Sequence, residues 1–306
     1  FMGSLGFVMY NVFVGVLQSV GDSKHPLYYL IISSLINVVL DLVFIAGFHY
    51  GVGAAALATT ISQFVSAFLC MGQLMRTKEE YRLCLRKIRF DREMLGQIIR
   101  IGLPSGIQNS IIAIANVVVQ SNINAFGETA MAGCGAYSKI EGFGFLPITS
   151  FTMALTTFVG QNLGAKQEER AKKGARFGIL TTVVLAELIG VLIFIFASPL
   201  TRAFDSNPEV IMYGVARART AALFFCLLAY SHAISAVLRG AGKSMVPMIV
   251  MLICWCVIRV TILVVFGKLV GKIDIVYWVY PITWGLSSII FFIYYKKANW
   301  LNSFKE

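Results

Sequence analysis

Nine long apolar runs, separated by short polar segments, constrain the fold of this 306-residue chain more than any single motif does. Each run is long enough to cross roughly 30 Å of hydrocarbon at about 1.5 Å per residue. A segment in lipid must satisfy all its backbone hydrogen bonds, and an apolar run of this length does so as a helix. The sequence therefore predicts an all-α polytopic membrane protein, with spans near 1–20, 27–48, 52–75, 97–124, 130–160, 176–198, 209–237, 246–267 and 275–295.

The composition agrees with this class and argues against several others. Charged residues make up 13% of the chain, about half the share typical of a soluble domain. The six cysteines form no CxxC pair and the three histidines show no helix-face pairing, so we expect neither a disulfide framework nor a metal centre built from them. No nucleophile–base pair is evident. We expect a protein that is not an enzyme and needs no cofactor.

One motif occurs twice, at 17–26 and again 221 residues later at 238–247, with matching Leu, Gly, Ser and Pro positions. Six predicted spans separate the copies, so the two halves run through the membrane in the same direction and are related by an axis along its normal. Many secondary transporters are built from such halves, with substrate bound where they meet. The first copy lies close to residue 1, whereas the second follows a full set of spans. We therefore expect the chain to be a fragment that lacks its own beginning.

The basic residues are distributed unevenly between the two sides of the predicted bundle. Of the 26 Lys and Arg residues, 19 fall in alternate loops and in the tail at 296–306, against three on the other side and four within spans. This bias predicts a multi-pass protein of the plasma (inner) membrane with a cytoplasmic C-terminus. It also explains the net charge of +11 without nucleic-acid binding.

The longest polar stretch, 77–96, is expected to be an amphipathic cytoplasmic linker whose apolar residues, from Tyr81 to Phe90, lie on the headgroup surface of the bilayer. It divides the chain into a segment of three spans at 1–76 and one of six spans at 97–295. We interpret the first as the second half of an N-terminal lobe and the second as a whole C-terminal lobe.

Asp41 is the most specific candidate site residue. It follows Ser33 and Asn37 at four-residue spacing, so the three side chains share one face of an otherwise apolar helix. A carboxylate within the bilayer costs about 2.5–3.5 kcal/mol and persists only with a partner or a function. Oxygen donors of this kind suit a small cation, and a desolvated carboxyl can also carry a proton. A structural hydrogen bond between helices is the simpler alternative.

Further polar residues within spans are candidates for lining a substrate cavity, although helix–helix hydrogen bonding is a common use of such residues. These candidates are Gln108, Asn109, Asn116, Gln120, Tyr137, Lys139 and Glu141. Glu187 and Arg259 are each expected to be a buried partner charge. Arg217 and Arg219 are expected to extend toward the outer surface.

Several motifs resemble those of the multidrug and toxic compound extrusion (MATE) family of transporters. The segment from Thr157 to Ala165, with Arg170, is similar to the hallmark at the inner end of that family's eighth helix. The two copies of the repeat resemble the family's paired loops. Residues 51–59 resemble its sixth helix. The residues that carry the loop resemblance are Gly160, Gln161, Asn162, Gly164, Leu238, Arg239, Gly240, Gly242, Pro247, Gly21 and Pro26.

The resemblance implies a two-lobed bundle of twelve helices, of which about nine are present here, working as a monomer in the lipid bilayer. It implies an antiporter that exports drugs or organic cations by alternating access in exchange for Na⁺ or H⁺. Asn37, Asp41 and Thr59 match the family's N-lobe cation ligands, so Na⁺ at Asp41 is the one metal ion expected. No acid matches the C-lobe cation site of another branch. A lipid-linked oligosaccharide flippase of the same superfamily, which needs a cationic cavity, and a non-transporting membrane scaffold remain alternatives.

Overall fold

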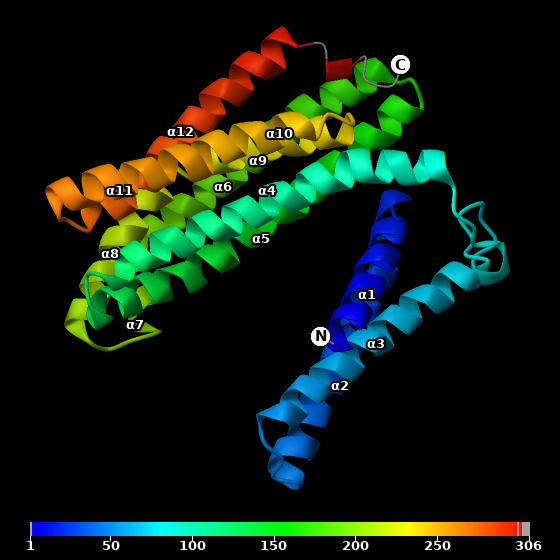
Figure 1. Ribbon diagram of the computed structural model, residues 1–306, viewed down its shortest axis with the longest axis horizontal. Helices are drawn as coiled ribbons and strands as arrows, with labels where there is room; N and C mark the ends of the chain where they lie inside the picture. Colours follow the sequence, from blue (N-terminus) through cyan, green and yellow to red (C-terminus); the bar gives the residue numbers. More distant parts are fainter. Residues whose placement is uncertain (1, 299, 302–306) are drawn as a thin grey trace. The chain divides into compact units, whose positions relative to one another are not determined.

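The computed structural model describes residues 2–298 and 300–301, and within them every regular element is helical. Contacts divide the chain into two units, Phe1–Asp91 and Arg92–Glu306. Figure 1 shows the helices of both units in chain order. The first unit holds α1 (Met2–Ser19), α2 (Lys24–Asp41), the π-helical turn η1 (Leu42–Gly47), α3 (Val52–Arg76) and the 3₁₀ turn η2 (Leu85–Lys87).

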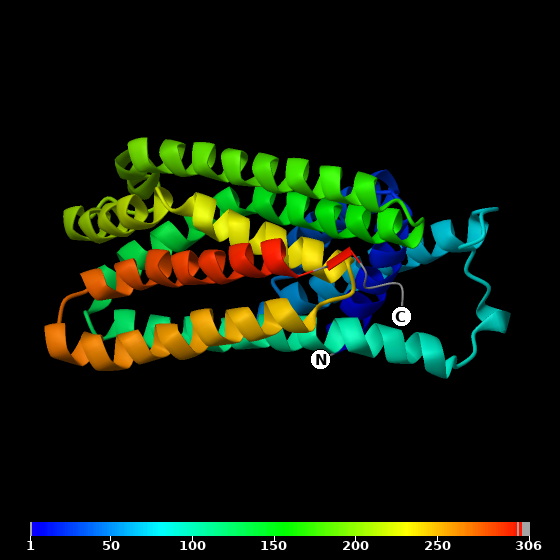
Figure 2. The same cartoon turned by 90° about the horizontal axis from the view of Figure 1, so that it is seen from above.

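The second unit is a larger bundle in which most helices run side by side (Figure 2). Its elements are α4 (Arg92–Asn124), α5 (Glu128–Gly164), α6 (Glu168–Ile195), α7 (Ala197–Arg202), α8 (Pro208–Ala222), α9 (Phe225–Gly240), α10 (Met245–Met251), the π-helical segment η3 (Leu252–Ile258), α11 (Arg259–Val270) and α12 (Asp274–Lys297). Its core lies mainly where α5, α6 and α9 pack together.

The number of membrane-spanning helices is close to the sequence prediction. Within the described residues, seven helices are long and apolar enough to cross a membrane, and the pair α8 and α9, bent by 55°, makes an eighth if it counts as one span. The remaining predicted span, at 1–20, corresponds to α1, an apolar helix whose Gly3–Ser19 stretch is below the length needed. The prediction of an all-α polytopic membrane protein is confirmed.

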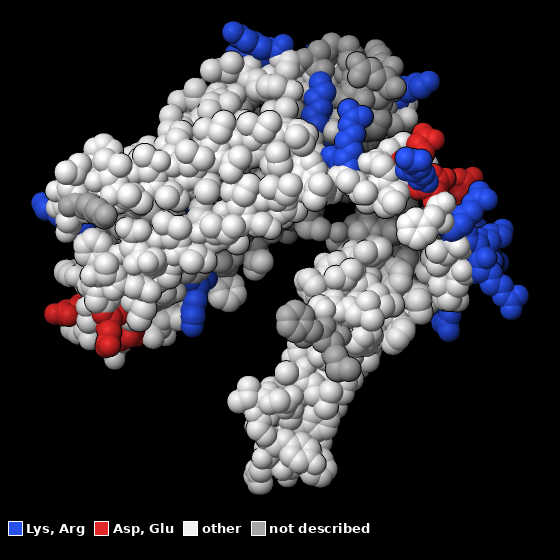
Figure 3. Space-filling view, viewed as in Figure 1, with Lys and Arg blue, Asp and Glu red and all other residues white. Residues whose placement is uncertain are grey.

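On the face that Figure 3 shows, charged side chains gather near the ends of the helices, and the surface between these ends is almost entirely uncharged. Many large apolar side chains are exposed, among them Leu35, Val39 and Phe143. Large apolar side chains that face outward from a well-formed bundle are expected of a protein whose solvent is lipid.

The segment after α3 differs from the surface-lying linker expected from the sequence. The Leu83 amide donates a hydrogen bond to the Leu74 carbonyl, and both Tyr81 and Leu83 pack against the buried cluster around Leu17. Phe90, in contrast, is 93% exposed. The beginning of the segment is thus part of the first unit's core, because folding back onto α3 buries its apolar side chains.

The predicted linker also ends earlier than expected, because α4 already begins at Arg92. At the other end of the chain, residues 302–306 of the predicted tail lie outside the described residues.

The two copies of the repeated motif form the same turn. In the first copy, the backbone amide of Asp22 donates to the Leu17 carbonyl, and Gly21 has a φ of +87°. In the second copy, the backbone amide of Lys243 donates to the Leu238 carbonyl, and Gly242 has a φ of +77°. A helix end closed by a left-handed glycine and a backward backbone bond is a Schellman-type cap. The sequence repeat is therefore also a repeat of local structure.

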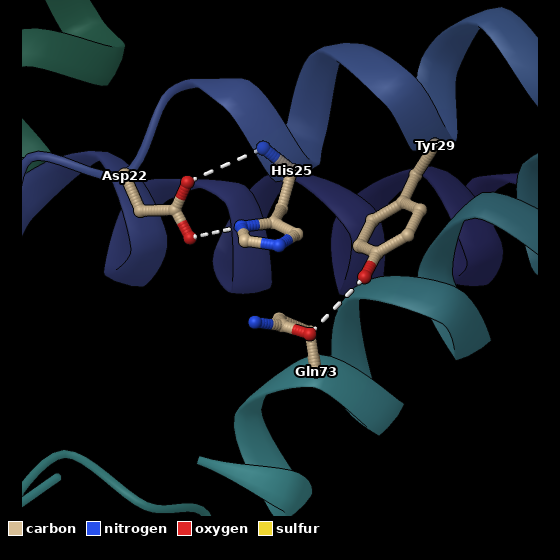
Figure 4. Close-up of polar contacts among 4 residues, drawn as sticks. All are labelled: Asp22, His25, Tyr29 and Gln73. Carbon is tan, nitrogen blue, oxygen red and sulfur yellow. Dashed lines mark hydrogen bonds and ion pairs between the residues drawn. The ribbon is translucent and has the colours of Figure 1, made fainter.

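The first copy adds side-chain contacts that hold the following helix (Figure 4). Asp22 accepts a hydrogen bond from the His25 amide and pairs with the His25 ring at 2.6 Å. One turn further on, the Tyr29 hydroxyl donates to Gln73 of α3 at 3.3 Å. These contacts fix the start of α2 and tie it to α3.

Candidate functional site

The acid of the first unit lies at the end of α2, where the π-helical turn η1 begins. Asn37 and Asp41 are one turn apart on the same face and are partly buried. The Asn37 Nδ2 and the Asp41 Oδ1 are each buried without a hydrogen-bond partner. Buried polar atoms are rarely left unpaired, because an unmade hydrogen bond costs about 1–3 kcal/mol and more for a charged group. These two atoms are therefore available to a ligand.

Ser33, the first residue of the predicted polar stripe, and Thr59, the third predicted cation ligand, have partners already. The buried Ser33 hydroxyl donates to the Ser62 carbonyl at 2.6 Å and so links α2 to α3. Thr59 lies on α3, where its exposed hydroxyl donates to the Ala55 carbonyl of its own helix. Of the three predicted cation ligands, the structure places Asn37 and Asp41 together and leaves Thr59 on the neighbouring helix.

The second unit contains a cavity of about 460 Å³, which is within the usual size range of pockets for drug-sized molecules. Helices α4, α5, α8, α9, α11 and α12 all contribute to its wall, together with η3. Three amides on one face of α4, those of Asn109, Asn116 and Gln120, line it beside Glu141 of α5. The four-residue and seven-residue spacings of these amides place them on one side of the helix.

Two arginines bring positive charge into this cavity. Arg259 of α11 is 1% exposed and donates from Nε and Nη2 to the Thr283 hydroxyl. Arg217 of α8 is 4% exposed and donates from Nη2 to the Tyr280 hydroxyl at 3.4 Å. The ring of Tyr280 contacts both, with its centroid 4.5 Å from the Arg259 guanidinium carbon and 5.3 Å from that of Arg217. Such cation–π contacts stabilise a desolvated guanidinium.

Aromatic rings form much of the remaining wall. His232 of α9 makes edge-to-face contacts with Phe145 at 5.0 Å and with Trp255 at 5.3 Å. Trp284 packs edge-on against Tyr280. Edge-to-face packing holds each ring in a fixed orientation, so the cavity is rigid and largely preformed on this side.

Three of the predicted cavity residues are not part of the wall. Neighbouring residues of a helix are about 100° apart around its axis, so Gln108 points away from the cavity that Asn109 lines. Its side chain is buried against the Met251 sulfur. Lys139 lies near the Phe204 ring on the exposed side of α5. Tyr137 is buried behind Arg217, and its ring is 5.1 Å from that guanidinium. These three residues therefore lie outside the lining of this cavity.

Arg217 is the functional candidate that sequence reasoning missed. Both Arg217 and Arg219 lie near one end of a predicted span, and both were expected to extend to the surface. Arg219 is exposed, but Arg217 is buried. Its buried neighbours Ala218, Ala221 and Ala222 are a signal that could have identified it, since small residues mark the packed face of a membrane helix.

Glu187 has a backbone partner, since its side chain accepts a hydrogen bond from the Cys226 amide at 2.9 Å.

The hallmark loop ends α5 in a tight turn. Asn162 accepts through its carbonyl from Gln167 and donates from its side chain to the Phe158 carbonyl, and Lys166 has a φ of +58°. Gly160 faces the Gly240 carbonyl of α9, so a Cβ added at Gly160 would be 3.4 Å from that oxygen. These residues shape and pack the helix ends. They lie outside the wall of the cavity.

Comparison with known proteins assigns the family. The MatE family model matches residues 104–265, more than half of the chain, and the chain belongs to the MATE family. The probable multidrug resistance protein YpnP of Bacillus subtilis (strain 168) is 27% identical over 300 residues, covering 98% of this chain and 67% of that protein. The probable multidrug resistance protein NorM of Thermotoga maritima is 28% identical, covering 87% of this chain and 58% of that protein.

A solved structure described as the outward-facing conformation of a multidrug resistance MATE family transporter superposes with a TM-score of 0.88 at 25% identity. That alignment covers 96% of this chain and 66% of the solved one. The chain thus has the MATE fold over nearly all of its length, and it spans about three-fifths to two-thirds of the length of these relatives.

Proposed function

We propose that the protein is a secondary active transporter that exports drug-like small molecules in exchange for an inward Na⁺ or H⁺. It works by alternating access, as a monomer in the plasma membrane with a cytoplasmic C-terminus, and it needs no cofactor. The names of the relatives, which describe multidrug resistance proteins, favour drug export over the oligosaccharide flippase. The cavity of about 460 Å³ favours a transporter over a scaffold, because it provides room for cargo.

The observation that carries the ion coupling is the unpaired Asp41 carboxylate oxygen beside the unpaired Asn37 amide. A carboxylate and an amide oxygen are donors that Na⁺ accepts, and the Asn37 amide can present either of its ends by a 180° flip. The same carboxyl can instead take up a proton, which removes the cost of a desolvated charge. Either ion would satisfy Asp41, and the family resemblance adds Thr59 of α3 as a third ligand.

Coupling follows if the ion has different affinity for the outward- and inward-facing states, since equal affinity would shift nothing. A carboxylate in an apolar bundle meets this requirement. Its free energy depends steeply on whether water, a proton or a metal ion compensates its charge. Occupancy of the Asp41 site would thereby bias the protein toward one state and drive cargo release.

Counterflow in proteoliposomes tests the proposal. Vesicles that contain the full-length protein are loaded with unlabelled ethidium or fluorescein, and uptake of the same dye in labelled form is measured. A carrier accelerates uptake when dye is present on the opposite side, and an imposed Na⁺ or H⁺ gradient adds to it. Uptake that is independent of both dye and ion on the other side would contradict an ion-coupled transporter.

A further inference from the structure

The charges of the cavity in the second unit are unbalanced. Among its lining residues, Arg217, Arg259 and Glu141 carry charge and His232 is titratable. Glu141 is the acid that faces the same cavity. The other walls contribute amides, hydroxyls and aromatic rings. Two almost fully buried cations and one acid leave an excess positive charge in the cavity.

One hydrogen-bond donor of these arginines has no acceptor. The Nη1 of Arg217 is buried and has no hydrogen-bond partner, although the residue is only 4% exposed and lines the cavity. Breaking or omitting the partner of a buried charge is strongly unfavourable, so such a donor is expected to have a ligand. A planar guanidinium presents paired donors that match the oxygen atoms of a carboxylate or phosphate.

The surrounding aromatic rings hold the two guanidinium groups at the cavity. Tyr280 and Tyr137 pack on Arg217, and Tyr280 and Trp255 pack on Arg259. Thr283 further holds Arg259 by two hydrogen bonds. Both guanidinium groups are therefore fixed in place before any ligand enters, which lowers the entropic cost of binding one.

We propose that this cavity binds the acidic group of its cargo, a carboxylate or phosphate, between Arg217 and Arg259, and an aromatic body against the wall formed by Phe145, Trp255 and Trp284. The cargo class is thus a planar aromatic acid or zwitterion, in place of the simple organic cation that the family resemblance implies. This assignment rests on the proposed transport function for its physiological meaning, but binding itself can be measured without transport.

The test compares two dyes of similar size and opposite charge. Fluorescein, an acidic three-ring dye, and rhodamine 123, its cationic relative, are titrated with the full-length protein in phosphatidylcholine nanodiscs and followed by fluorescence polarisation. Loss of a charge-assisted contact to an anion corresponds to about a tenfold to hundredfold change in affinity. We expect Arg217→Gln and Arg259→Gln each to weaken fluorescein binding at least about tenfold and to leave rhodamine 123 binding unchanged or tighter.

Two further variants separate a charge effect from disturbed packing. Arg219→Gln removes an exposed arginine two residues along the same helix and should leave fluorescein affinity within about twofold. Glu141→Gln removes the opposing acid and should strengthen fluorescein binding several-fold, a gain that misfolding cannot produce. Unchanged fluorescein affinity in Arg217→Gln, or weakening by Glu141→Gln, would overturn the proposal.

A lipid headgroup could supply the same acidic chemistry as a soluble cargo. Phosphatidylglycerol added to the nanodiscs should not displace fluorescein, and displacement in proportion to that lipid would contradict a soluble cargo. The proposed transport function fails separately. Arginine-dependent binding without counterflow contradicts transport alone, and counterflow without arginine-dependent binding contradicts the acidic cargo alone.

Discussion

Gly240 of α9 lies directly against the backbone of Thr156 on α5, so that a Cβ added at Gly240 would be 2.6 Å from the Thr156 carbonyl oxygen. The Thr156 hydroxyl donates to the Ala236 carbonyl at 3.2 Å across the same contact. Close approach of two helix backbones, with hydroxyl-to-carbonyl bonds between them, is a common way to join helices in lipid, where the hydrophobic effect does not draw them together. Gly240 is therefore a packing residue.

Gly240→Ala is expected to destabilise the second unit by about 1–3 kcal/mol, because the new methyl group would have to displace backbone atoms. The measurement is the midpoint of thermal unfolding of the purified protein in detergent. Gly135→Ala, at a position inside α5 where a Cβ meets nothing within 4 Å, is the matched control and should be neutral or stabilising. Equal midpoints for the two variants would contradict the packing role.

Gly242→Ala tests the backbone conformation of the repeated turn without a packing change, since a Cβ at Gly242 meets nothing within 4 Å. A left-handed conformation costs an L-residue about 1–2 kcal/mol, and asparagine tolerates it better than alanine. Gly242→Ala should therefore unfold at a lower temperature than Gly242→Asn. The opposite order would indicate that the positive φ does not limit stability.

Sequence reasoning predicted the fold well because the signals are long and repeated. Apolar runs determine helices in lipid, and the 221-residue repeat identified both copies of a turn whose glycines share a positive φ. It also located Asn37 and Asp41 on one face of α2, because four-residue spacing fixes that geometry.

The cavity could be predicted only in part. Asn109, Asn116 and Gln120 share a face of α4, and this face does line the cavity. Arg217 could not be placed, because its burial depends on Tyr280 of a helix more than 60 residues later in the chain. Such long-range partners are absent from the local pattern of a single helix.

Glu187→Ala is expected to cost about 1–3 kcal/mol, because the Cys226 amide in the first turn of α9 would lose its acceptor at the 55° bend. Glu187→Gln keeps an acceptor oxygen and should retain most of the stability. Thermal unfolding of both variants checks the difference. A glutamine variant as unstable as the alanine variant would show that charge, and not this hydrogen bond, is what matters.

The predicted topology places Lys166, in the exposed turn between α5 and α6, on the cytoplasmic side. In a background whose native cysteines are replaced, a cysteine in place of Lys166 (K166C) should resist an impermeant thiol reagent added to intact cells and should react once the cells are opened. Ready labelling in intact cells would reverse the orientation.

The most direct test of the account is ion-driven efflux by the full-length Asp41→Asn variant in proteoliposomes. The substitution keeps the shape of the side chain and removes its charge, so we expect gradient-driven export of ethidium or fluorescein, whichever the wild type transports faster, to be abolished at near-normal expression. Ser33→Ala, which removes only the hydrogen bond to Ser62, should reduce export far less. Export by Asp41→Asn at the wild-type rate under an imposed Na⁺ or H⁺ gradient would contradict the central claim.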